Sequence, residues 1–198
     1  MTAVESYKEL RHGAERIPDA GGYDLSAGEM NPEIWRRFAS LLAREGAERA
    51  WEPFANPDGR TFEAFREVGV ELVAASLASE HPDIEECDST TEEPRGDFGG
   101  VLFHPPYFGS KPFTLDPRDM SQTRDEDEWL VMMESAADIA VEHMAPGGVV
   151  CAVGRRYRHG GREIRLDEWL VMAFCGPLWP ACVWSSEPDV AIIMRWGR

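Results

Sequence analysis

Short apolar segments alternate with amphipathic ones along most of the chain, and this alternation constrains the fold more than any other feature. Segments rich in β-branched and aromatic residues predict strands at 49–55, 70–77, 83–90, 97–108, 146–154, 180–186 and 189–197. Apolar residues at helical spacing predict helices at 31–46, 61–69, 128–145 and 165–176. Strands that alternate with helices favour an α/β fold, with a mainly parallel sheet covered by helices on both faces.

The ends of these segments carry turn and cap residues that fit the same fold. Asn31 and Pro32 open the first predicted helix, where they suit an N-cap and a first-turn proline. The last two predicted strands are joined by a short turn at Glu187 and Pro188. A connection this short requires antiparallel neighbours, so one strand near an edge of the sheet is expected to be antiparallel.

The length of the chain favours one domain. Its 198 residues are 43% hydrophobic, which is enough for one core, and no Gly-, Ser- or Pro-rich linker divides them. We expect a domain over residues 23–198. A polar N-terminal extension, residues 1–22, would precede it and could be flexible. The chain has no long apolar run and its N-terminus is too polar for a signal peptide, so we expect a cytoplasmic protein without membrane contact.

Cysteine and histidine spacing argues against a metal centre. The four cysteines form no CxxC pair and stand mostly in apolar surroundings, so we expect buried, reduced thiols. The five histidines are scattered and form no HExxH motif. We therefore expect no metal.

The charge of the chain is strongly acidic. Thirty-six Asp and Glu residues oppose 20 Lys and Arg residues, which gives a formal net charge of −16. Such a total repels phosphate backbones unless the basic residues gather on one face, so it does not by itself predict nucleic-acid binding. Basic clusters stand at Arg36 and Arg37 and over residues 154–165. A cluster of this kind is more often a solvated loop than a binding surface.

Two loops at predicted strand ends are candidates for a ligand site. In open α/β sheets, ligands bind at the carboxyl ends of the strands. One loop has the sequence "EPFANPDGRT" over residues 52–61, and the other has "HPPYFGS" over residues 104–110. Two consecutive prolines cannot extend a strand ladder, and they present backbone carbonyls in a fixed orientation beside the aromatic residue that follows.

The segment "HPPY" resembles the Asp/Asn/Ser-Pro-Pro-Tyr motif of S-adenosylmethionine-dependent DNA amino-methyltransferases, of the N6-adenine or N4-cytosine type. The segment "EPFANPDGRT" looks like the Asp-Pro-Phe-Ala-Gly-Ser-Gly-Thr cofactor loop of that family. Similar segments occur in the family's order: "GEMNPEIWRRFASLL" before the cofactor loop, then "CDST", and "MAPGGVVCAVG" after the next helix. The resemblance covers roughly Tyr23 to the C-terminus. It implies a single Rossmann-like class I methyltransferase domain with a mainly parallel seven-stranded sheet.

The resemblance implies S-adenosyl-L-methionine as the cofactor. The residues it assigns to the cofactor site are Asn31, Glu52, Phe54, Ala55, Asn56, Asp58, Gly59, Thr61, Ser76 and Asp88. Asp88 would bind the adenine amine of the cofactor. The chain departs from the family pattern at two places. Asn56, Pro57 and Asp58 replace most of the glycine-rich loop, and Ser76 stands where a ribose-binding acid is expected, with Glu80 further along.

The resemblance also implies the chemistry of the site. The catalytic residues would be His104, Pro105, Pro106 and Tyr107. The Pro105 carbonyl and the neutral His104 imidazole would accept hydrogen bonds from an amino group, and Tyr107 would stack on an extruded base. The residues expected to contact the substrate, DNA, are Phe108, Lys111, Arg155, Arg156 and Arg158.

Several alternatives remain open at this level. The segment 104–107 could end a strand, with Tyr107 and Phe108 packing in the core, and Asp88 could be a turn residue. The substrate could be RNA or a protein amide. The chain could also be a lapsed methyltransferase fold whose acidic surface binds a basic protein. Little of the chain is left to read a DNA sequence, so a protein partner could supply target recognition.

Overall fold

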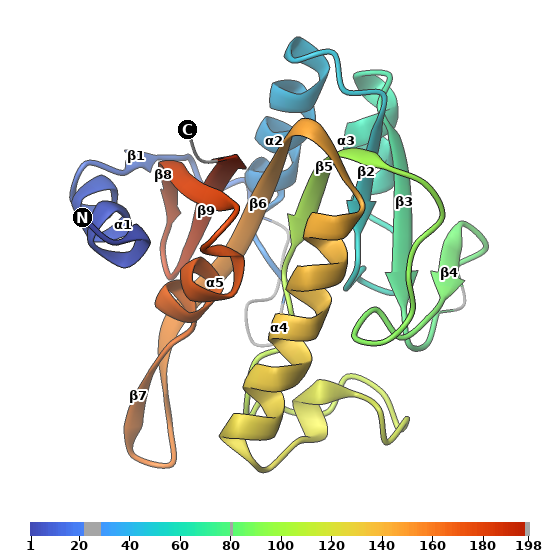
Figure 1. The fold of residues 1–198 in the computed structure, drawn as a ribbon. Helices are drawn as coiled ribbons and strands as arrows, with labels where there is room; N and C mark the ends of the chain where they lie inside the picture. Colours follow the sequence, from blue (N-terminus) through green and yellow to red (C-terminus); the bar gives the residue numbers. More distant parts are fainter. Residues whose placement is uncertain (22–28, 80, 197–198) are drawn as a thin grey trace.

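A mixed β-sheet forms the centre of the molecule (Figure 1). The computed structural model describes residues 1–21, 29–79 and 81–196. The strands in these residues are β1 (Glu15–Arg16), β2 (Arg49–Glu52), β3 (Glu71–Ser76), β4 (Ile84–Glu86), β5 (Phe98–Phe103), β6 (Met144–His159), β7 (Arg162–Arg165), β8 (Leu178–Ser186) and β9 (Asp189–Trp196). Their order across the sheet is β1-β8-β9-β6-β5-β2-β3-β4, and β7 pairs with β6 alone.

The directions of the strands confirm the predicted sheet. Strands β2 to β6 pair in parallel with one another, whereas β9 is antiparallel to both β6 and β8. Strand β9 therefore lies near one edge as the antiparallel strand that the short turn at Glu187 and Pro188 required. The seven predicted strands are all present. The short β1 and the hairpin strand β7 are additional.

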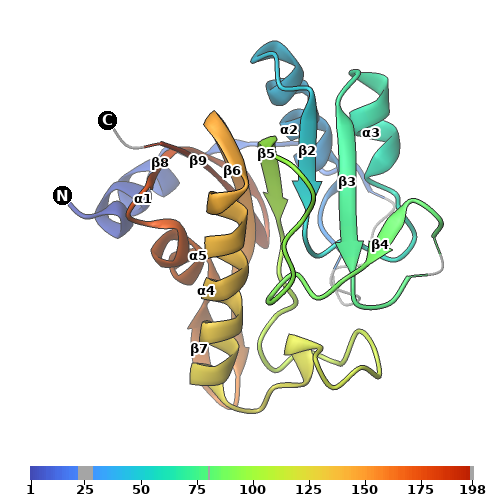
Figure 2. The same cartoon turned by 45° about the vertical axis from the view of Figure 1, so that its right-hand side comes forward.

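Helices cover both faces of the sheet (Figure 2). The helices are α1 (Ala3–His12), α2 (Pro32–Arg44), α3 (Phe62–Glu67), α4 (Glu126–Glu142) and α5 (Leu166–Phe174), with a 3-10 turn, η2 (Met120–Gln122). Helices α1, α4 and α5 share one apolar core, and α2 and α3 contribute to a second core on the opposite face. The four helices predicted from apolar spacing correspond to α2, α3, α4 and α5.

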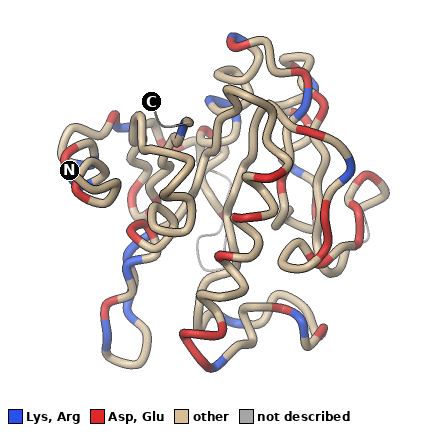
Figure 3. Tube along the Cα trace, in the orientation of Figure 1, with Lys and Arg blue, Asp and Glu red and all other residues tan. Residues whose placement is uncertain are grey.

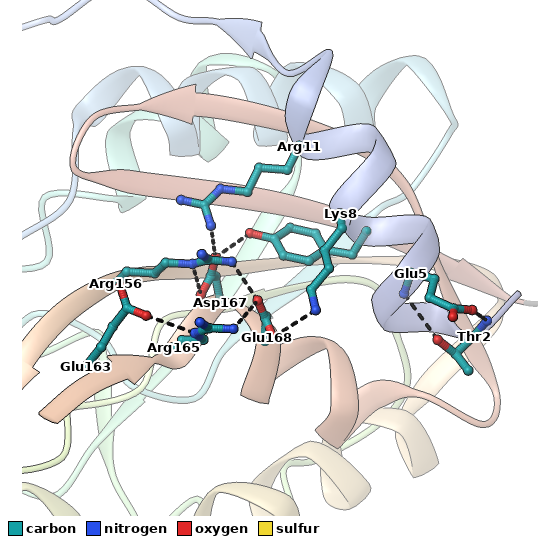
Figure 4. Close-up of polar contacts among 10 residues, drawn as sticks. Thr2, Glu5, Lys8, Arg11, Arg156, Glu163, Arg165, Asp167 and Glu168 are labelled. Atoms are coloured by element: carbon teal, nitrogen blue, oxygen red, sulfur yellow. Dashed lines mark hydrogen bonds and ion pairs between the residues drawn. The ribbon is translucent and has the colours of Figure 1, made fainter.

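The first helix packs into the domain. Sequence analysis places residues 1–22 in an extension, whereas α1 lies against β8 and α5 and buries Tyr7 completely. The Tyr7 hydroxyl donates to Asp167 Oδ2 at 2.6 Å. Asp167, also fully buried, pairs with Arg11 and Arg156 (Figure 4). Helix α1 is therefore part of the packed structure, and the bond to Asp167 satisfies the buried Tyr7 hydroxyl.

The basic segment after Gly154 extends a strand. Strand β6 continues to His159 and turns back into β7, which gives a hairpin that projects beyond the sheet. Gly160 and Gly161 form its turn with φ of 57° and 81°. The hairpin carries Arg156 and Arg158, whereas Arg155 still lies in the main sheet, opposite Asp189 of β9.

Other expectations from composition have mixed outcomes. Cys151 is buried, but Cys175 is exposed because it follows α5 in a surface turn. Within the described ranges, no cluster of three His, Cys, Asp or Glu side chains is arranged to hold a metal ion. No helix there is long and apolar enough to span a membrane.

Candidate active site

A pocket lies where the strand order reverses, between β2 and β5, at the carboxyl ends of the parallel strands. It encloses about 280 Å³. The pocket brings together most residues predicted for cofactor and catalysis: Glu52, Phe54, Ala55, Asn56, Thr61, Ser76, Asp88, His104, Pro105, Pro106 and Tyr107. Lys111, predicted to contact the substrate, also lines it. The two loops chosen from the sequence thus share one site.

Glu52, the last residue of β2, forms the floor of the pocket. Strand β2 ends here because Pro53 has no N–H to continue the ladder. Glu52 is only 2% exposed, and the Thr61 hydroxyl donates to its Oε2 at 2.6 Å. Burial raises the pKa of Glu52 to about 7, although the Thr61 hydrogen bond acts in the opposite direction. This pair closes the loop between β2 and α3.

The divergent loop has a defined conformation. Gly59 has φ of 65°, and a Cβ at this position would lie 2.7 Å from the His81 ring, so the single remaining glycine is required here. Arg60 pairs with Asp58 and places Nη1 2.7 Å from Glu29 Oε2. Both Glu29 and Arg60 line the pocket. Arg60 of this loop and Glu29, which precedes α2, therefore place an opposite-charge pair at the pocket.

Asp88 is a turn residue that also lines the pocket. Its Oδ1 accepts from the Thr90 N–H and hydroxyl at 3.0 and 2.6 Å, as a turn residue does. It is also 4% exposed and lines the pocket. Ser76 lines the same wall and donates to the Ala78 carbonyl at 3.2 Å. Glu80 lies outside the described residues.

His104 and Tyr107 belong to a polar cluster at the inner end of the pocket. Nε2 of His104 lies 3.2 Å from the Tyr107 hydroxyl, which also contacts Asp189 Oδ1 and Arg155 Nε at 3.2 Å each. Burial, with a smaller contribution from Arg155, lowers the pKa of His104 to about 3. A pKa this low leaves the imidazole neutral near pH 7, with one ring nitrogen that can accept a hydrogen bond.

The ring of Tyr107 is less available than the stacking role requires. It stacks on Tyr157 with ring centroids 5.4 Å apart, and the Arg155 guanidinium lies 5.0 Å from its centroid. The adjacent Pro106 carbonyl accepts from Trp129 Nε1 at 3.1 Å. The Pro-Pro-Tyr segment is thus held rigidly by side chains of β6, β9 and α4.

Several predicted site residues lie outside the pocket lining. Asn31 is buried, caps α2 and donates to Ser186 Oγ at 2.7 Å. Phe108 is buried against Trp129 and His159. The remaining members of this group are Asp58, which is exposed and pairs with Arg60; Gly59; Arg155; Arg156, which pairs with Asp167 and Glu168; and Arg158, which is exposed.

Some pocket residues were not singled out from the sequence. The unassigned loop between β5 and α4 contributes Phe113, Arg118 and Met120, and the loop after β2 contributes Arg60. Asp119 fixes the first of these loops, since its carboxylate accepts from the N–H groups of Phe113 and Thr114. In the sequence, only the length of this polar loop indicated that it could contribute to a site.

The fold is similar to solved methyltransferases. An S-adenosylmethionine-dependent methyltransferase from Clostridium acetobutylicum has TM-score 0.58 and 11% identity, covering 98% of this chain and all of that one. CalS10, an amino pentose methyltransferase from Micromonospora echinaspora solved with bound SAM, has TM-score 0.56 and 16% identity, covering 90% and 100%. A Burkholderia thailandensis 1,6-didemethyltoxoflavin-N1-methyltransferase, solved with S-adenosylhomocysteine, has TM-score 0.55 and 14% identity, covering 99% and 87%.

These comparisons identify the architecture as the class I S-adenosylmethionine-dependent methyltransferase fold. At such low identities they establish the fold alone. No protein-family model and no curated protein sequence matches the chain.

Proposed function

We propose that this protein is an S-adenosyl-L-methionine-dependent methyltransferase that modifies an exocyclic amino group of a DNA base, adenine N6 or cytosine N4. The observation that carries the proposal is the shared pocket. The segment from His104 to Tyr107 lines it together with residues at the ends of β2, β3 and β4. A methyl donor and an acceptor amine must meet in one enclosed space for direct transfer, and this pocket provides one.

The residues present fit the proposed cofactor at two ends of the pocket. Asp88 lies beside Thr90, whose carbonyl accepts from Ser135 of α4. Glu29 lies two residues before the cap of α2, on the opposite face of the sheet. Asp88 would accept from the adenine amine, while Arg60 and Glu29 would match the carboxylate and ammonium of the methionine part. When bound, the cofactor supplies an electrophilic methyl group.

The chain's own residues would then prepare the amine. An exocyclic amine is a weak nucleophile because its lone pair is delocalised into the ring. His104 and the Pro105 carbonyl would accept its two N–H groups and draw the nitrogen toward tetrahedral geometry. The neutral imidazole has a lone pair for this purpose and could take the proton that the methylated amine releases. Phe113, which is 43% exposed and lines the pocket, would offer the aromatic surface for a base, since Tyr157 and Arg155 pack on the ring of Tyr107.

Unpaired cations on the two flanking segments support a nucleic-acid substrate. In the part of the chain that the structure describes, no ion pair holds Lys111 or Arg124, in the loop before α4, or Arg158, in the β6–β7 hairpin. Figure 3 shows basic positions on both segments, at the end of the molecule toward which β2, β3 and β5 point. These cations would contact phosphates and offset the acidic total locally.

The test is methyl transfer from isotopically labelled S-adenosyl-L-methionine to duplex DNA, single-stranded DNA and RNA, followed by nucleoside analysis. We expect label in N6-methyladenine or N4-methylcytosine. His104→Ala should abolish this transfer without weakening binding of S-adenosylhomocysteine. His143→Ala, which changes a histidine outside the pocket, is the matched control. Label found only in RNA or in a small amine would replace DNA as the substrate.

A second candidate, methylation of an amino group in a small molecule, is favoured by the formal net charge of −16, which opposes binding to a phosphate backbone. A non-enzymatic descendant would bind neither S-adenosyl-L-methionine nor S-adenosylhomocysteine. Calorimetry with both ligands, at low and high salt, separates that possibility from both enzymatic ones.

A further inference from the structure

Arg155 and Asp189 form a buried ion pair beneath the proposed catalytic segment. They are direct partners in the antiparallel ladder of β6 and β9. Arg155 Nε lies 2.7 Å from Asp189 Oδ1, and their side chains are 12% and 0% exposed. Neither residue lines the pocket. Any effect they have on a substrate must therefore pass through the residues above them.

The Tyr107 hydroxyl connects this pair to His104. A phenol oxygen has one proton to donate and two lone pairs to accept with. Its proton is directed at Asp189 Oδ1, 3.2 Å away, because a carboxylate can only accept. One lone pair accepts from Arg155 Nε, which can only donate.

The remaining lone pair faces His104 Nε2 at 3.2 Å. With the hydroxyl proton already directed at Asp189, the imidazole must act as the donor in this contact. His104 therefore carries its proton on Nε2, and Nδ1 keeps the lone pair. Nδ1 makes no hydrogen bond to the described residues, and His104 lines the pocket.

A histidine at this position needs such support more than a carboxylate does. A carboxylate has lone pairs on both oxygens, whereas a neutral imidazole has one lone pair whose position depends on the tautomer. The buried pair is also incompletely bonded, since Arg155 Nη2 and Asp189 Oδ2 have no partner among the described residues. Its best-placed atoms, Nε and Oδ1, are both directed at Tyr107 instead.

We propose that Arg155 and Asp189 are positioning residues that act through Tyr107 to hold the proton of His104 on Nε2 and leave the Nδ1 lone pair for the amino group of the substrate. This inference rests on the proposed function. The groups that face His104 are Arg155 from β6, Asp189 from β9 and Tyr107 from its own loop, and Glu52, Asp88 and Lys111 line the same pocket. The cation of Arg155 adds to burial in keeping the imidazole uncharged.

The test is long-range ¹⁵N–¹H correlation NMR of the histidine rings across a pH titration, in the free protein. The chain has five histidines, and His104→Gln assigns the relevant signals. In the wild type we expect Nε2 protonated, Nδ1 unprotonated and no titration near neutral pH. Tyr107→Phe keeps the ring but removes the hydroxyl, so both tautomers should become populated and the two nitrogen shifts should approach each other.

Arg155→Met should raise the titration midpoint of His104 by about one pH unit or more, because it removes the nearby cation. Arg155→Lys keeps the charge in a smaller side chain and guards against a folding failure. It should preserve the midpoint but disturb the tautomer. Arg195→Met is the matched control. Arg195 lies on β9 in the same ladder but forms an exposed ion pair with Glu45 at the end of α2, so this change should leave the titration and tautomer of His104 unchanged.

A wild-type proton on Nδ1, or a folded Tyr107→Phe protein with an unchanged tautomer, would overturn the proposal. In activity assays, Tyr107→Phe should lower kcat at least tenfold and leave the KM for the cofactor within about twofold. The NMR readout needs no cofactor or substrate, so the two hypotheses can fail separately. If the imidazole responds as stated but no amine is methylated, the proposed function fails. If transfer occurs but the imidazole does not respond, the positioning role fails.

Discussion

Thr61 donates its hydroxyl hydrogen to Glu52 Oε2 at 2.6 Å and so links the end of β2 to the start of α3. The two residues are nine positions apart in the chain, and the intervening loop carries Arg60, which is proposed to bind the methionine carboxylate of the cofactor. Within the described residues, this bond is the only hydrogen bond to the Glu52 carboxylate, which is nearly sealed from water. It therefore ties the shape of the pocket to the protonation of one buried acid.

The stability of the fold should depend on pH through Glu52. Its pKa rises from 4.5 to about 7 on folding, so between these values the folded state holds a proton that the unfolded state has released. The free energy of unfolding therefore falls as pH rises through this window. Glu52→Gln removes the titrating group. The free energy of unfolding of this variant, relative to the wild type, should therefore rise by on the order of 2 kcal/mol between pH 5 and pH 8.

Urea unfolding at both pH values measures this difference. Glu63→Gln, the same substitution at an exposed position of α3, is the matched control. If the difference in unfolding free energy between Glu52→Gln and the wild type is the same at both pH values, folding does not raise the pKa of Glu52, and the prediction is wrong.

Arg60 should contribute to binding through the amino-acid part of the cofactor only. Its guanidinium lines the pocket beside Glu29. Arg60→Met should weaken S-adenosylhomocysteine about tenfold or more, the loss of one charge-assisted contact, and should change the affinity for 5′-methylthioadenosine little, since that ligand has no carboxylate. Isothermal titration calorimetry measures both affinities. Arg66→Met, in an exposed position of α3, is the control. An equal loss for both ligands would mean that Arg60 only shapes the loop.

The N-terminal helix should stabilise the fold without serving the pocket. Tyr7→Phe removes a buried hydrogen bond to Asp167 and should cost about 2 kcal/mol of unfolding free energy. Asp167→Asn leaves Arg11 and Arg156 without their buried counter-charge and should cost about 3 kcal/mol or more. Lys8→Met breaks a partly exposed pair with Glu168 and should cost less than about 1 kcal/mol.

Chemical denaturation gives these values, and S-adenosylhomocysteine affinity should stay unchanged in all three variants. A variant that loses cofactor affinity while remaining folded would show instead that α1 and α5 couple to the pocket.

Cations beside the pocket should set the salt dependence of DNA binding. Lys111→Met and Arg158→Met should each reduce the slope of log affinity against log salt by about 0.9, the value for one phosphate contact. Arg195→Met, which lies in an exposed pair with Glu45, should leave the slope unchanged. Fluorescence anisotropy with a labelled duplex at several salt concentrations measures the slopes. Unchanged slopes for Lys111 and Arg158 would place any DNA elsewhere on the surface.

The order of strands and helices was predictable because each element carries its own periodicity. Apolar spacing located α2 to α5, and the short turn at Pro188 required the antiparallel β9. The motifs located the pocket as well, since "HPPY" and "EPFANPDGRT" both follow strands whose carboxyl ends meet at the same edge. What these predictions share is that they depend on neighbouring residues in the chain.

The partners of individual side chains were not predictable in the same way. Arg155 and Arg156 were expected at the substrate, but Asp189 and Asp167, which follow them by 34 and 11 positions, pair with them instead. Asn31 was expected at the cofactor and caps α2. Residues 1–12 fall in the segment that was assigned to an extension. Nothing near Tyr7 in the sequence reveals that its hydroxyl bonds to Asp167, 160 positions away.

The sequence by itself thus determined the class of fold, the edge of the sheet that bears the pocket and the residue types that surround it. Only the tertiary structure decided which cations are paired, which groups pack on the ring of Tyr107 and which polar groups surround His104. The physical reason is that secondary structure follows local patterns, whereas the charge and protonation of a buried group depend on partners that packing brings from distant parts of the chain.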